Sequence, residues 1–460
     1  MIREVSVAVT VKCRYFFSEV SVQSPVKCRS SLCRMSFPQV GGIELDLVAR
    51  RIAAHAAEFL ESFRVVIING PRQSGKTTLL RQLEACRGGT YLILDDRTLR
   101  AAAHADPEAF VADGPKPMMI DGIQRGGDDL VLAIKEVVDR SPTRGQFVLA
   151  GSTRFLATPS LSESLVGRAG ILEVWPFAQH ELVGGDTSFL VRAFEEPESF
   201  RATAQSSHSR TDYFDLIVRG FYPEAMAMRS EHARAEWYSA YVQGIIDTDI
   251  REMAKIDEPS NLRQLLRLTA AATAQELNLV KTASDLGLHR TTVSRYLGLL
   301  ETVFLVKPLP AWSRNLNARA VRRPKLHITD TGLAAHLLSV DAEGLGARVA
   351  PARGALVETF IANELAKQAT WSPFRTNLYH WRVSQGAEVD MVVERTNGRV
   401  IGVEAKATDA VDLGDFKGLS TLRDSLGDQF VHGFVLYTGR RSLAFGDRLT
   451  ALPISALWDR

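Results

Sequence analysis

Cysteine is scarce in this sequence of 460 residues, and the few cysteines form no recognisable framework. There is no C-x-x-C pair and no histidine at zinc-finger spacing, which argues against both a disulfide scaffold and a cysteine-ligated metal. This usage is typical of a protein in a reducing cytosol. The four cysteines are Cys13, Cys28, Cys33 and Cys86.

Long apolar runs and an excess of one charge are lacking too. No stretch approaches the ~20 apolar residues of a membrane span, and charges interrupt the opening MIREVSVAVTVKCRYFF where a signal peptide needs a continuous apolar segment. We therefore expect a cytoplasmic protein without a membrane partner. The 55 Lys and Arg balance 53 Asp and Glu to a net charge of +2, so any nucleic-acid surface must be a local patch.

The remaining composition is that of an ordinary globular protein. With 45% hydrophobic and 23% charged residues, a chain of this length can form roughly two to four domains. The first 34 residues differ, because VKCR occurs at 11–14 and again at 26–29 amid Ser, Val and basic residues without helical periodicity. We expect residues 1–34 to be a disordered or weakly ordered extension ahead of a natural start at Met35.

Strand-like and helical segments alternate after this extension. The apolar runs RVVIING, TYLILDD, KPMMIDG and QFVLAGS are separated by helical stretches such as DLVLAIKEVVDR, which is the pattern of βαβ units with a parallel sheet. The pattern then becomes mainly helical, and ends in a second α/β segment. The expected domains are a P-loop α/β domain at 35–176, a helical lid or linker at 177–260, a winged helix-turn-helix-like module at 261–324 and an α/β domain at 325–460.

A phosphate-binding loop is the strongest signal in the chain. GPRQSGKT matches G-x-x-x-x-G-K-[ST] and lies between a buried strand and the helix TTLLRQLEAC. Inward-facing amides and the helix N-terminus attract phosphates, the lysine reaches the β- and γ-phosphates, and the threonine hydroxyl ligates Mg²⁺. We therefore expect ATP and Mg²⁺ as cofactors. The expected contacts are Gly70, Pro71, Arg72, Gln73, Ser74, Gly75, Lys76, Thr77 and Thr78.

The run MMIDGIQ predicts the second half of this site. Asp121, at the tip of a neighbouring strand, is placed to hold Mg²⁺ through water, although a turn aspartate before glycine is the plainer alternative. Gly122 provides no group to orient the attacking water. The candidates to replace that group are Gln124, Glu163 or a residue of a partner subunit, and without any of them the site would bind ATP and turn over slowly.

Two further features belong to the same prediction. FVLAGST ends a strand in Ser152 and Thr153, small hydroxyls suited to sensing the γ-phosphate, unless they only cap the next helix. Arg168 in SLVGRAG is a candidate arginine finger that would reach a neighbouring subunit's phosphate, and an ordinary surface arginine is the alternative. The finger would require a homo-oligomer.

GPRQSGKTTLL, MMIDGIQ, FVLAGST and LVGRAGILEVWPF, in that order, make the chain resemble the prokaryotic AAA-type ATPases that carry a C-terminal domain of unknown function. The likeness continues through RGFYPEA, ITDTGLAAHLL, GALVETFIANEL and GAEVDMVVE with GVEAKAT, and so covers nearly everything after about residue 40. The resemblance implies an ATPase domain joined to a winged helix and a restriction-endonuclease-like fold. In this family the second phosphate-site block commonly ends Asp-Glu, so Gly122 is a departure that concerns hydrolysis more than binding.

TASDLGLHRTTVSRYLGLL reads as a helix-turn-helix. Gly287 lies at the turn, and the second helix carries an apolar face together with Arg290 and Arg295, whose guanidinium groups suit phosphates or base edges in a major groove. FLVKPLPAW would provide wing-like strands. DNA is thus an expected partner, although such modules also serve only for packing or dimerisation.

Carboxylates near the C-terminus suggest a second metal site. Asp390 ends GAEVD, and Glu404 and Lys406 share one face of the strand VIGVEAK. This pattern is similar to the restriction-endonuclease-like core, in which acids hold Mg²⁺ and the lysine helps activate water. Glu358 on a neighbouring helix would complete the cluster, with Glu388 as an auxiliary charge. The alternatives are a solvated sheet face, or a fold that binds DNA or a partner without cutting.

The sequence thus predicts an ATP- and Mg²⁺-binding AAA-type ATPase coupled to a DNA-interacting C-terminal half with a nuclease-like fold. The competing hypothesis is a nucleotide-dependent switch that hydrolyses ATP slowly and binds DNA or protein without cleaving it. The two hypotheses share the phosphate loop, and differ over what Lys406 and the surrounding acids do.

Overall fold

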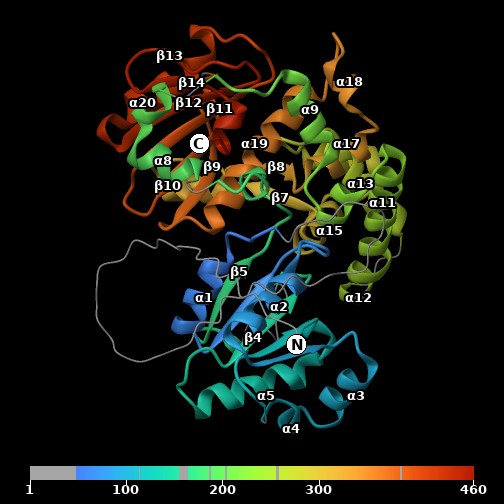
Figure 1. Ribbon diagram of the computed structural model, residues 1–460. Coiled ribbons are helices and arrows are strands. Elements are labelled where there is room, and N and C mark those ends of the chain that lie inside the picture. Colours follow the sequence, from blue (N-terminus) through green and yellow to red (C-terminus); the bar gives the residue numbers. More distant parts are fainter. Residues whose placement is uncertain are drawn as a thin grey trace, which may run out of the picture. The chain divides into compact units, whose positions relative to one another are not determined.

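The computed structural model describes residues 48–112, 114–154, 164–185, 188–202, 205–254, 258–383 and 386–459 (Figure 1). The predicted extension at 1–34 and the candidate Glu163 therefore lie outside the described residues.

The first α/β domain contains a five-stranded parallel sheet in the order β2-β3-β4-β1-β5, which confirms the predicted sheet type. The strands are β1 (Val65–Asn69), β2 (Thr90–Ile93), β3 (Met118–Asp121), β4 (Phe147–Gly151) and β5 (Ala169–Glu173). Between and before them lie α1 (Ala53–Ser62), α2 (Lys76–Arg87), α3 (Arg97–Ala105), α4 (Pro107–Ala112), η1 (Ile123–Arg125) and α5 (Gly127–Arg140).

Helices cover both faces of this sheet because its inner strand β1 is apolar on both sides. Along β1, Val66 and Ile68 pack in one cluster with residues of α1 and α2, whereas Val65 and Ile67 pack in another with residues of α5. Continuous burial on both faces is what a run such as VVII predicts for a parallel strand. Because all the strands are parallel, the loops that follow them lie at one edge of the sheet.

A helical region follows the parallel sheet. It comprises α7 (Gln179–Leu182), α8 (Phe189–Glu195), η3 (Pro197–Ala202), α9 (Arg210–Arg219), α10 (Pro223–Ala227), α11 (Glu231–Gly244), the π-helix η4 (Ile245–Ile250) and α12 (Arg251–Met253).

A three-helix segment next packs with a small antiparallel sheet in the order β6-β8-β7. Gly287 adopts φ +64° at the turn between the second and third helices, a left-handed conformation that glycine adopts without strain. The elements are α13 (Pro259–Ala271), β6 (Gln275–Glu276), α14 (Leu279–Leu286), α15 (Arg290–Thr302), β7 (Val306–Leu309), α16 (Leu316–Val321) and β8 (Lys325–Ile328).

The C-terminal part contains a mixed sheet in the order β13-β14-β12-β11-β10-β9. The strands β9, β10 and β11 form an antiparallel meander, and α20 then makes a crossover that returns β12 parallel to β11. The elements are α17 (Thr331–Leu338), α18 (Ala342–Gly346), α19 (Arg353–Thr370), β9 (Thr376–Arg382), β10 (Glu388–Arg395), β11 (Val400–Lys406), η5 (Leu413–Phe416), α20 (Lys417–Leu426), η6 (Gly427–Gln429), β12 (Phe430–Tyr437), β13 (Leu443–Ala444), β14 (Leu449–Pro453) and η7 (Ile454–Leu457).

One hydrophobic cluster runs through these last three regions, from Phe189 to Trp458. The boundaries expected at residues 260 and 324 fall inside it, and the second also separates β8 from the two strands with which it pairs. In the described ranges, no helix combines the length and the apolar character needed to cross a membrane.

Candidate functional site

The predicted phosphate loop follows β1 and precedes α2. Its backbone requires glycine, because Gly70 and Gly75 adopt φ +156° and +93°, and a Cβ on Gly70 would lie 2.0 Å from the carbonyl oxygen of Val174. Gln73 also has a positive φ of 58°. Such a wrap turns successive amide groups inward, as phosphate binding requires.

Lys76 begins α2 and its side chain lies back along the loop. Its Nζ donates hydrogen bonds to the carbonyl oxygens of Gly70 at 2.9 Å and Pro71 at 2.6 Å. Burial lowers the pKa of Lys76 to about 8, against the raising effect of the Asp121 charge. A buried ammonium whose charged form lacks solvation is well placed to gain from an arriving phosphate.

The structure brings Thr77 and Asp121 together. Thr77 Oγ1, on α2, donates to Asp121 Oδ2 at the end of β3 at 2.5 Å, although β4 separates β3 from β1, the strand that precedes the loop. The hydroxyl of Tyr91, on β2, donates to the same oxygen at 3.1 Å. A hydroxyl beside a carboxylate matches the oxygen ligands that Mg²⁺ prefers, so these residues fit the predicted metal. Tyr91 was not predicted, although it lies on the strand next to the one that carries Asp121.

Gly122 has φ +76° and opens the short helix η1, so the position of the missing acid is a left-handed backbone site. Two residues on, Gln124 Nε2 donates to Ser152 Oγ at 3.4 Å. Of the predicted replacements, Gln124 thus lies at the same strand ends as Asp121. Thr153 follows Ser152 beyond β4.

Arg168 lies at the opposite edge of the sheet from the phosphate loop. It immediately precedes β5, whose residue Ala169 pairs with Val65 at the start of β1, whereas the loop follows the end of β1. Its guanidinium bonds to Asp139 on α5. Arg168 is therefore not brought to the loop of its own chain.

Arg50 supports the loop and was not predicted. Its guanidinium donates to the carbonyl oxygens of Ser74 and Trp175, each at 2.6 Å, and to Glu181 at 3.0 Å. Arg50 and Glu181 are both buried. Nothing in the local sequence pattern distinguishes Arg50, because its three partners are distant in the chain.

Another unpredicted contact holds the third loop residue. Arg72 forms an ion pair with the buried Asp249 of the π-helix η4, and its carbonyl oxygen accepts a 3.2 Å hydrogen bond from the hydroxyl of Tyr241 on α11.

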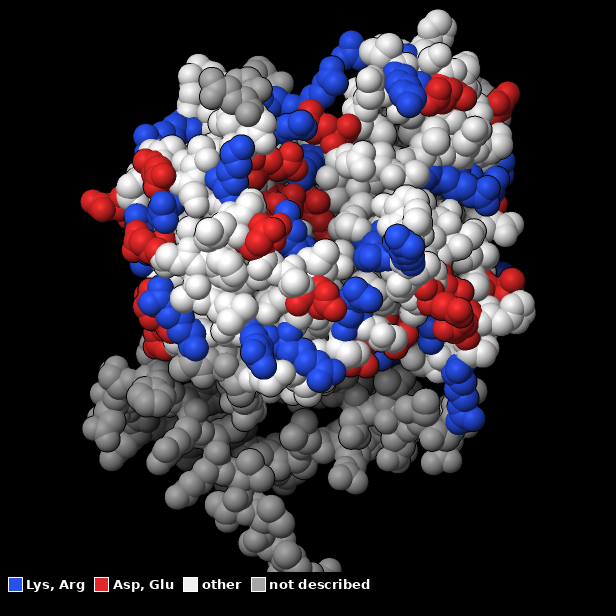
Figure 2. Space-filling view, turned by 90° about the horizontal axis from the view of Figure 1, so that it is seen from above, with Lys and Arg blue, Asp and Glu red and all other residues white. Residues whose placement is uncertain are grey.

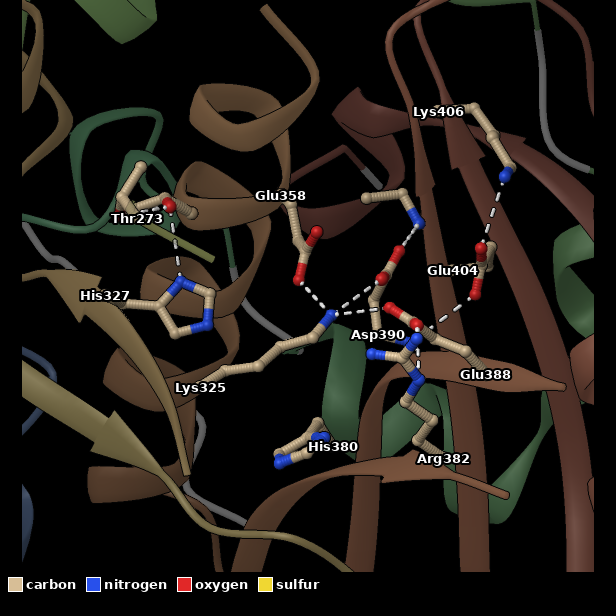
Figure 3. Close-up of polar contacts among 12 residues, drawn as sticks. Thr273, Lys325, His327, Glu358, His380, Arg382, Glu388, Asp390, Glu404 and Lys406 are labelled. Atoms are coloured by element: carbon tan, nitrogen blue, oxygen red, sulfur yellow. Dashed lines mark hydrogen bonds and ion pairs between the residues drawn. The ribbon is translucent and has the colours of Figure 1, made fainter. Parts of the chain in front are cut away.

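The predicted C-terminal carboxylates lie close together around a lysine (Figure 3). Lys325 Nζ, from β8, lies 2.7 Å from Glu358 on α19 and 3.0 Å from both Asp390 and Glu388 on β10. Although burial opposes it, the charges of Asp390 and Glu358 raise the pKa of Lys325. Lys325 was not predicted, and Glu388 shares in its contacts rather than remaining peripheral.

The predicted Glu404 and Lys406 lie beside this cluster. Lys406 Nζ is 3.2 Å from Glu404 Oε1 and 3.5 Å from Asp415, while the amide of Ala405 donates to Asp390 at 3.0 Å. Burial, and next the charge of Asp390, raise the pKa of Glu404 to about 8. Within the part of the chain that the structure describes, no group of three His, Cys, Asp or Glu is placed to hold a metal ion. The predicted C-terminal metal ligands therefore remain a hypothesis.

The two arginines of the predicted helix-turn-helix are exposed. On α15, Val293, Tyr296 and Leu300 are buried, whereas Arg290 and Arg295 face solvent.

Comparison with known families agrees with this geometry. Residues 62–183 match an AAA domain, and with the parallel sheet and phosphate loop they define a P-loop AAA-type ATPase domain. Residues 210–344 and 353–457 match two domains of unknown function, DUF8612 and DUF4143.

Relatives among individual proteins share most of the chain. The uncharacterized proteins Mb2031c of Mycobacterium bovis and Rv2008c of Mycobacterium tuberculosis are each 29% identical over 418 residues, which is 89% of this chain and 85% of theirs. A solved structure, the Walker-type ATPase PABY2304 of Pyrococcus abyssi, is 15% identical with a TM-score of 0.38, and the match covers 62% of this chain and 94% of that one.

Proposed function

We propose that this protein is an ATP- and Mg²⁺-dependent ATPase whose nucleotide state controls a C-terminal half that interacts with DNA. Lys76 would hold the β- and γ-phosphates, Thr77 and Asp121 would hold Mg²⁺, and Gln124 with Ser152 would orient the attacking water. When bound, Mg²⁺ would neutralise the phosphate charge.

The observation that carries the coupling is a contact between the phosphate edge and α15. Arg154 follows Ser152 and Thr153, and its amide and Nε donate to the carbonyl oxygens of Thr302 at 2.9 Å and Glu301 at 3.1 Å. These carbonyls end α15, where backbone acceptors lack partners within the helix. A change at Ser152 or Thr153 on nucleotide binding would thus act directly on α15.

The order of elements supports a winged helix. Helix α13, strand β6, helices α14 and α15, and strands β7 and β8 follow one another, and β8 lies between β6 and β7. Arg290, Thr291, Ser294 and Arg295 are exposed on α15. Cationic and hydroxyl side chains on a solvent-facing second helix suit phosphate and base contacts in a major groove.

Binding of labelled duplex DNA over a range of salt concentrations tests this proposal. The double variant Arg290→Ala/Arg295→Ala should weaken binding and reduce the slope of log affinity against log salt by about two, because two phosphate contacts are lost. Arg97→Ala, at an exposed position on α3, is the matched control. Wild-type affinity and slope in the double variant would contradict the assignment.

A second candidate function is Mg²⁺-dependent DNA cleavage. The succession α19-β9-β10-β11-α20-β12 supports a restriction-endonuclease-like fold, and it gathers Glu358, Asp390, Glu404 and Lys406. Acidic side chains gather in a hollow on the face shown in Figure 2, with basic side chains around it. The Lys325 ammonium already neutralises part of this cluster, which favours DNA binding without cutting.

Incubation of labelled DNA with Mg²⁺ and ATP distinguishes the two. Cleavage that disappears in Lys406→Ala, but persists in the exposed control Lys417→Ala, would establish nuclease activity. A mobility shift without cleavage would support the ATP-controlled binding protein.

A further inference from the structure

Arg72, the third residue of the phosphate loop, is held by the helical region at two points. Tyr241 on α11 donates to its carbonyl oxygen, and Asp249 on η4 accepts from its Nη2. α11 continues directly into η4, a six-residue π-helix. Short π-helical segments interrupt α-helices and are frequent at functional sites. One helical segment thus holds both the backbone and the charge of Arg72.

The guanidinium of Arg72 has N–H groups that take no part in its ion pair with Asp249. Its side chain is 34% exposed, whereas that of Asp249 is 5% exposed. Nη2 bonds to Asp249, while among the described residues Nε and Nη1 have no acceptor. A guanidinium is a rigid fork of five N–H groups, so it can hold a carboxylate at one edge and a phosphate at another.

The charged groups of Arg72 and Asp249 also lie near Lys76 of the phosphate loop. Burial is the main cause of the lowered pKa of Lys76, and the charges of Arg72 and Asp249 act on the same ammonium in opposite directions. Lys76 reaches the β- and γ-phosphates in a loop of this type. The guanidinium of Arg72 therefore lies close enough to Lys76 for its charge to act on that ammonium.

We propose that Arg72 donates its free edge to the γ-phosphate and that Asp249 is the positioning residue that holds Arg72 there. This inference rests on the proposed ATP binding. ATP would complete a bridge from the phosphate through Arg72 to η4, whereas ADP would leave the second edge of the guanidinium unfilled. Coupling of this kind is reciprocal, so the Asp249 contact would also favour ATP over ADP.

Calorimetry with Mg²⁺-ATP and Mg²⁺-ADP tests the inference on the full chain. Asp249→Asn should weaken ATP binding roughly tenfold and ADP binding less than about twofold, within the usual range of coupling between sites. The matched control is Asp247→Asn, on the same π-helix, whose partner is Arg263 at 2.5 Å rather than a loop residue. This control should leave the ratio of the two affinities unchanged.

Arg72→Ala should reduce the preference for ATP in the same way. Because Asp249 acts through Arg72, the double variant Arg72→Ala/Asp249→Asn should lose no more preference than Arg72→Ala alone. If Asp249→Asn fails to fold, Arg72→Ala decides by itself whether the guanidinium recognises the γ-phosphate.

Two failures are distinguishable. A wild-type protein that binds neither nucleotide would overturn the proposed ATPase function. A wild-type protein that binds both, with ATP and ADP affinities that fall together in Asp249→Asn or stay unchanged in Arg72→Ala, would overturn this inference alone.

Discussion

Thr77 Oγ1 and Asp121 Oδ2 are joined by a 2.5 Å hydrogen bond, although β4 lies between β3, which ends at Asp121, and β1, which leads into the phosphate loop. The two residues are 44 positions apart in the chain, and only the parallel sheet collects their strand ends at one edge. Both oxygen atoms are of the kind that Mg²⁺ prefers as ligands, which is the basis of the proposed metal site.

Removal of either oxygen donor should therefore impair Mg²⁺-dependent ATP hydrolysis. Thr77→Ala and Asp121→Asn are expected to reduce kcat/KM by about 100-fold or more, a loss of roughly 3 kcal/mol of transition-state stabilisation. Thr77→Ser keeps the hydroxyl and should stay within about tenfold of wild type. Steady-state assays at several Mg²⁺ concentrations measure this, and an active Asp121→Asn enzyme would show that the metal is held elsewhere.

Gly122 should prove to be a backbone requirement. A Cβ there would have room, since its nearest neighbour is Asp95 Oδ1 at 3.6 Å, but φ is +76°. Gly122→Ala should lower the free energy of unfolding by about 1–2 kcal/mol, the cost of the left-handed conformation, and Gly122→Asn by less. Denaturant titration provides the measurement.

If Gln124 already orients the attacking water, Gly122→Glu should leave the rate of ATP turnover nearly unchanged.

Lys325 should be essential for the stability of the acidic cluster. Lys325→Met leaves Glu358, Glu388 and Asp390 without their shared counterion, and should cost about 3–5 kcal/mol of unfolding free energy. Lys417→Met, at an exposed position, is the control. If the acids can hold a divalent cation, added Mg²⁺ should raise the Tm of Lys325→Met more than that of wild type. A loss below about 1 kcal/mol would contradict the importance of this contact.

Acid should destabilise the fold through His432. Burial is the main cause that lowers the pKa of this fully buried histidine from 6.5 to about 4, and its Nε2 lies 2.9 Å from Thr450 Oγ1. Between these values the unfolded chain binds a proton that the folded protein does not, so stability falls as the pH falls from about 6.5 to 4, by at most about 3 kcal/mol.

His432→Gln should flatten this part of the stability profile, and His232→Gln, at an exposed position on α11, is the control. Unfolding free energies at pH 7, 6, 5 and 4 provide the test. A slope in His432→Gln as steep as in wild type would assign the effect to other groups.

Local patterns in the sequence predicted the parallel sheet and the ATPase class because they are encoded within short segments. The run RVVIING needs no partner to indicate a buried strand, and GPRQSGKT specifies its own backbone conformation. Asp121 followed from the rule that parallel strands end at one edge. The C-terminal acids could also be grouped, because strand alternation places Glu404 and Lys406 on one face.

The residues that were missed act through contacts between distant segments. Lys325 is an unremarkable residue of a short strand until the fold brings its side chain to Glu388 and Asp390 on β10, and Asp249 lies 177 residues from Arg72. No periodicity or spacing encodes such pairs. The expectation for Arg168 concerns a neighbouring subunit's phosphate, so its place at the other edge of its own sheet leaves that expectation a prediction.

The contacts of Arg50 bear on how the protein can be dissected. The region that matches an AAA domain begins at residue 62, downstream of this arginine. A fragment that begins at residue 62 would lack Arg50. Glu181 would then be buried without its ion-pair partner, and the carbonyl oxygen of Ser74, in the turn before Lys76, would lose its hydrogen bond. Assays on such a fragment would measure a weak nucleotide affinity. The cause would be the truncation, and the value would not describe the longer protein.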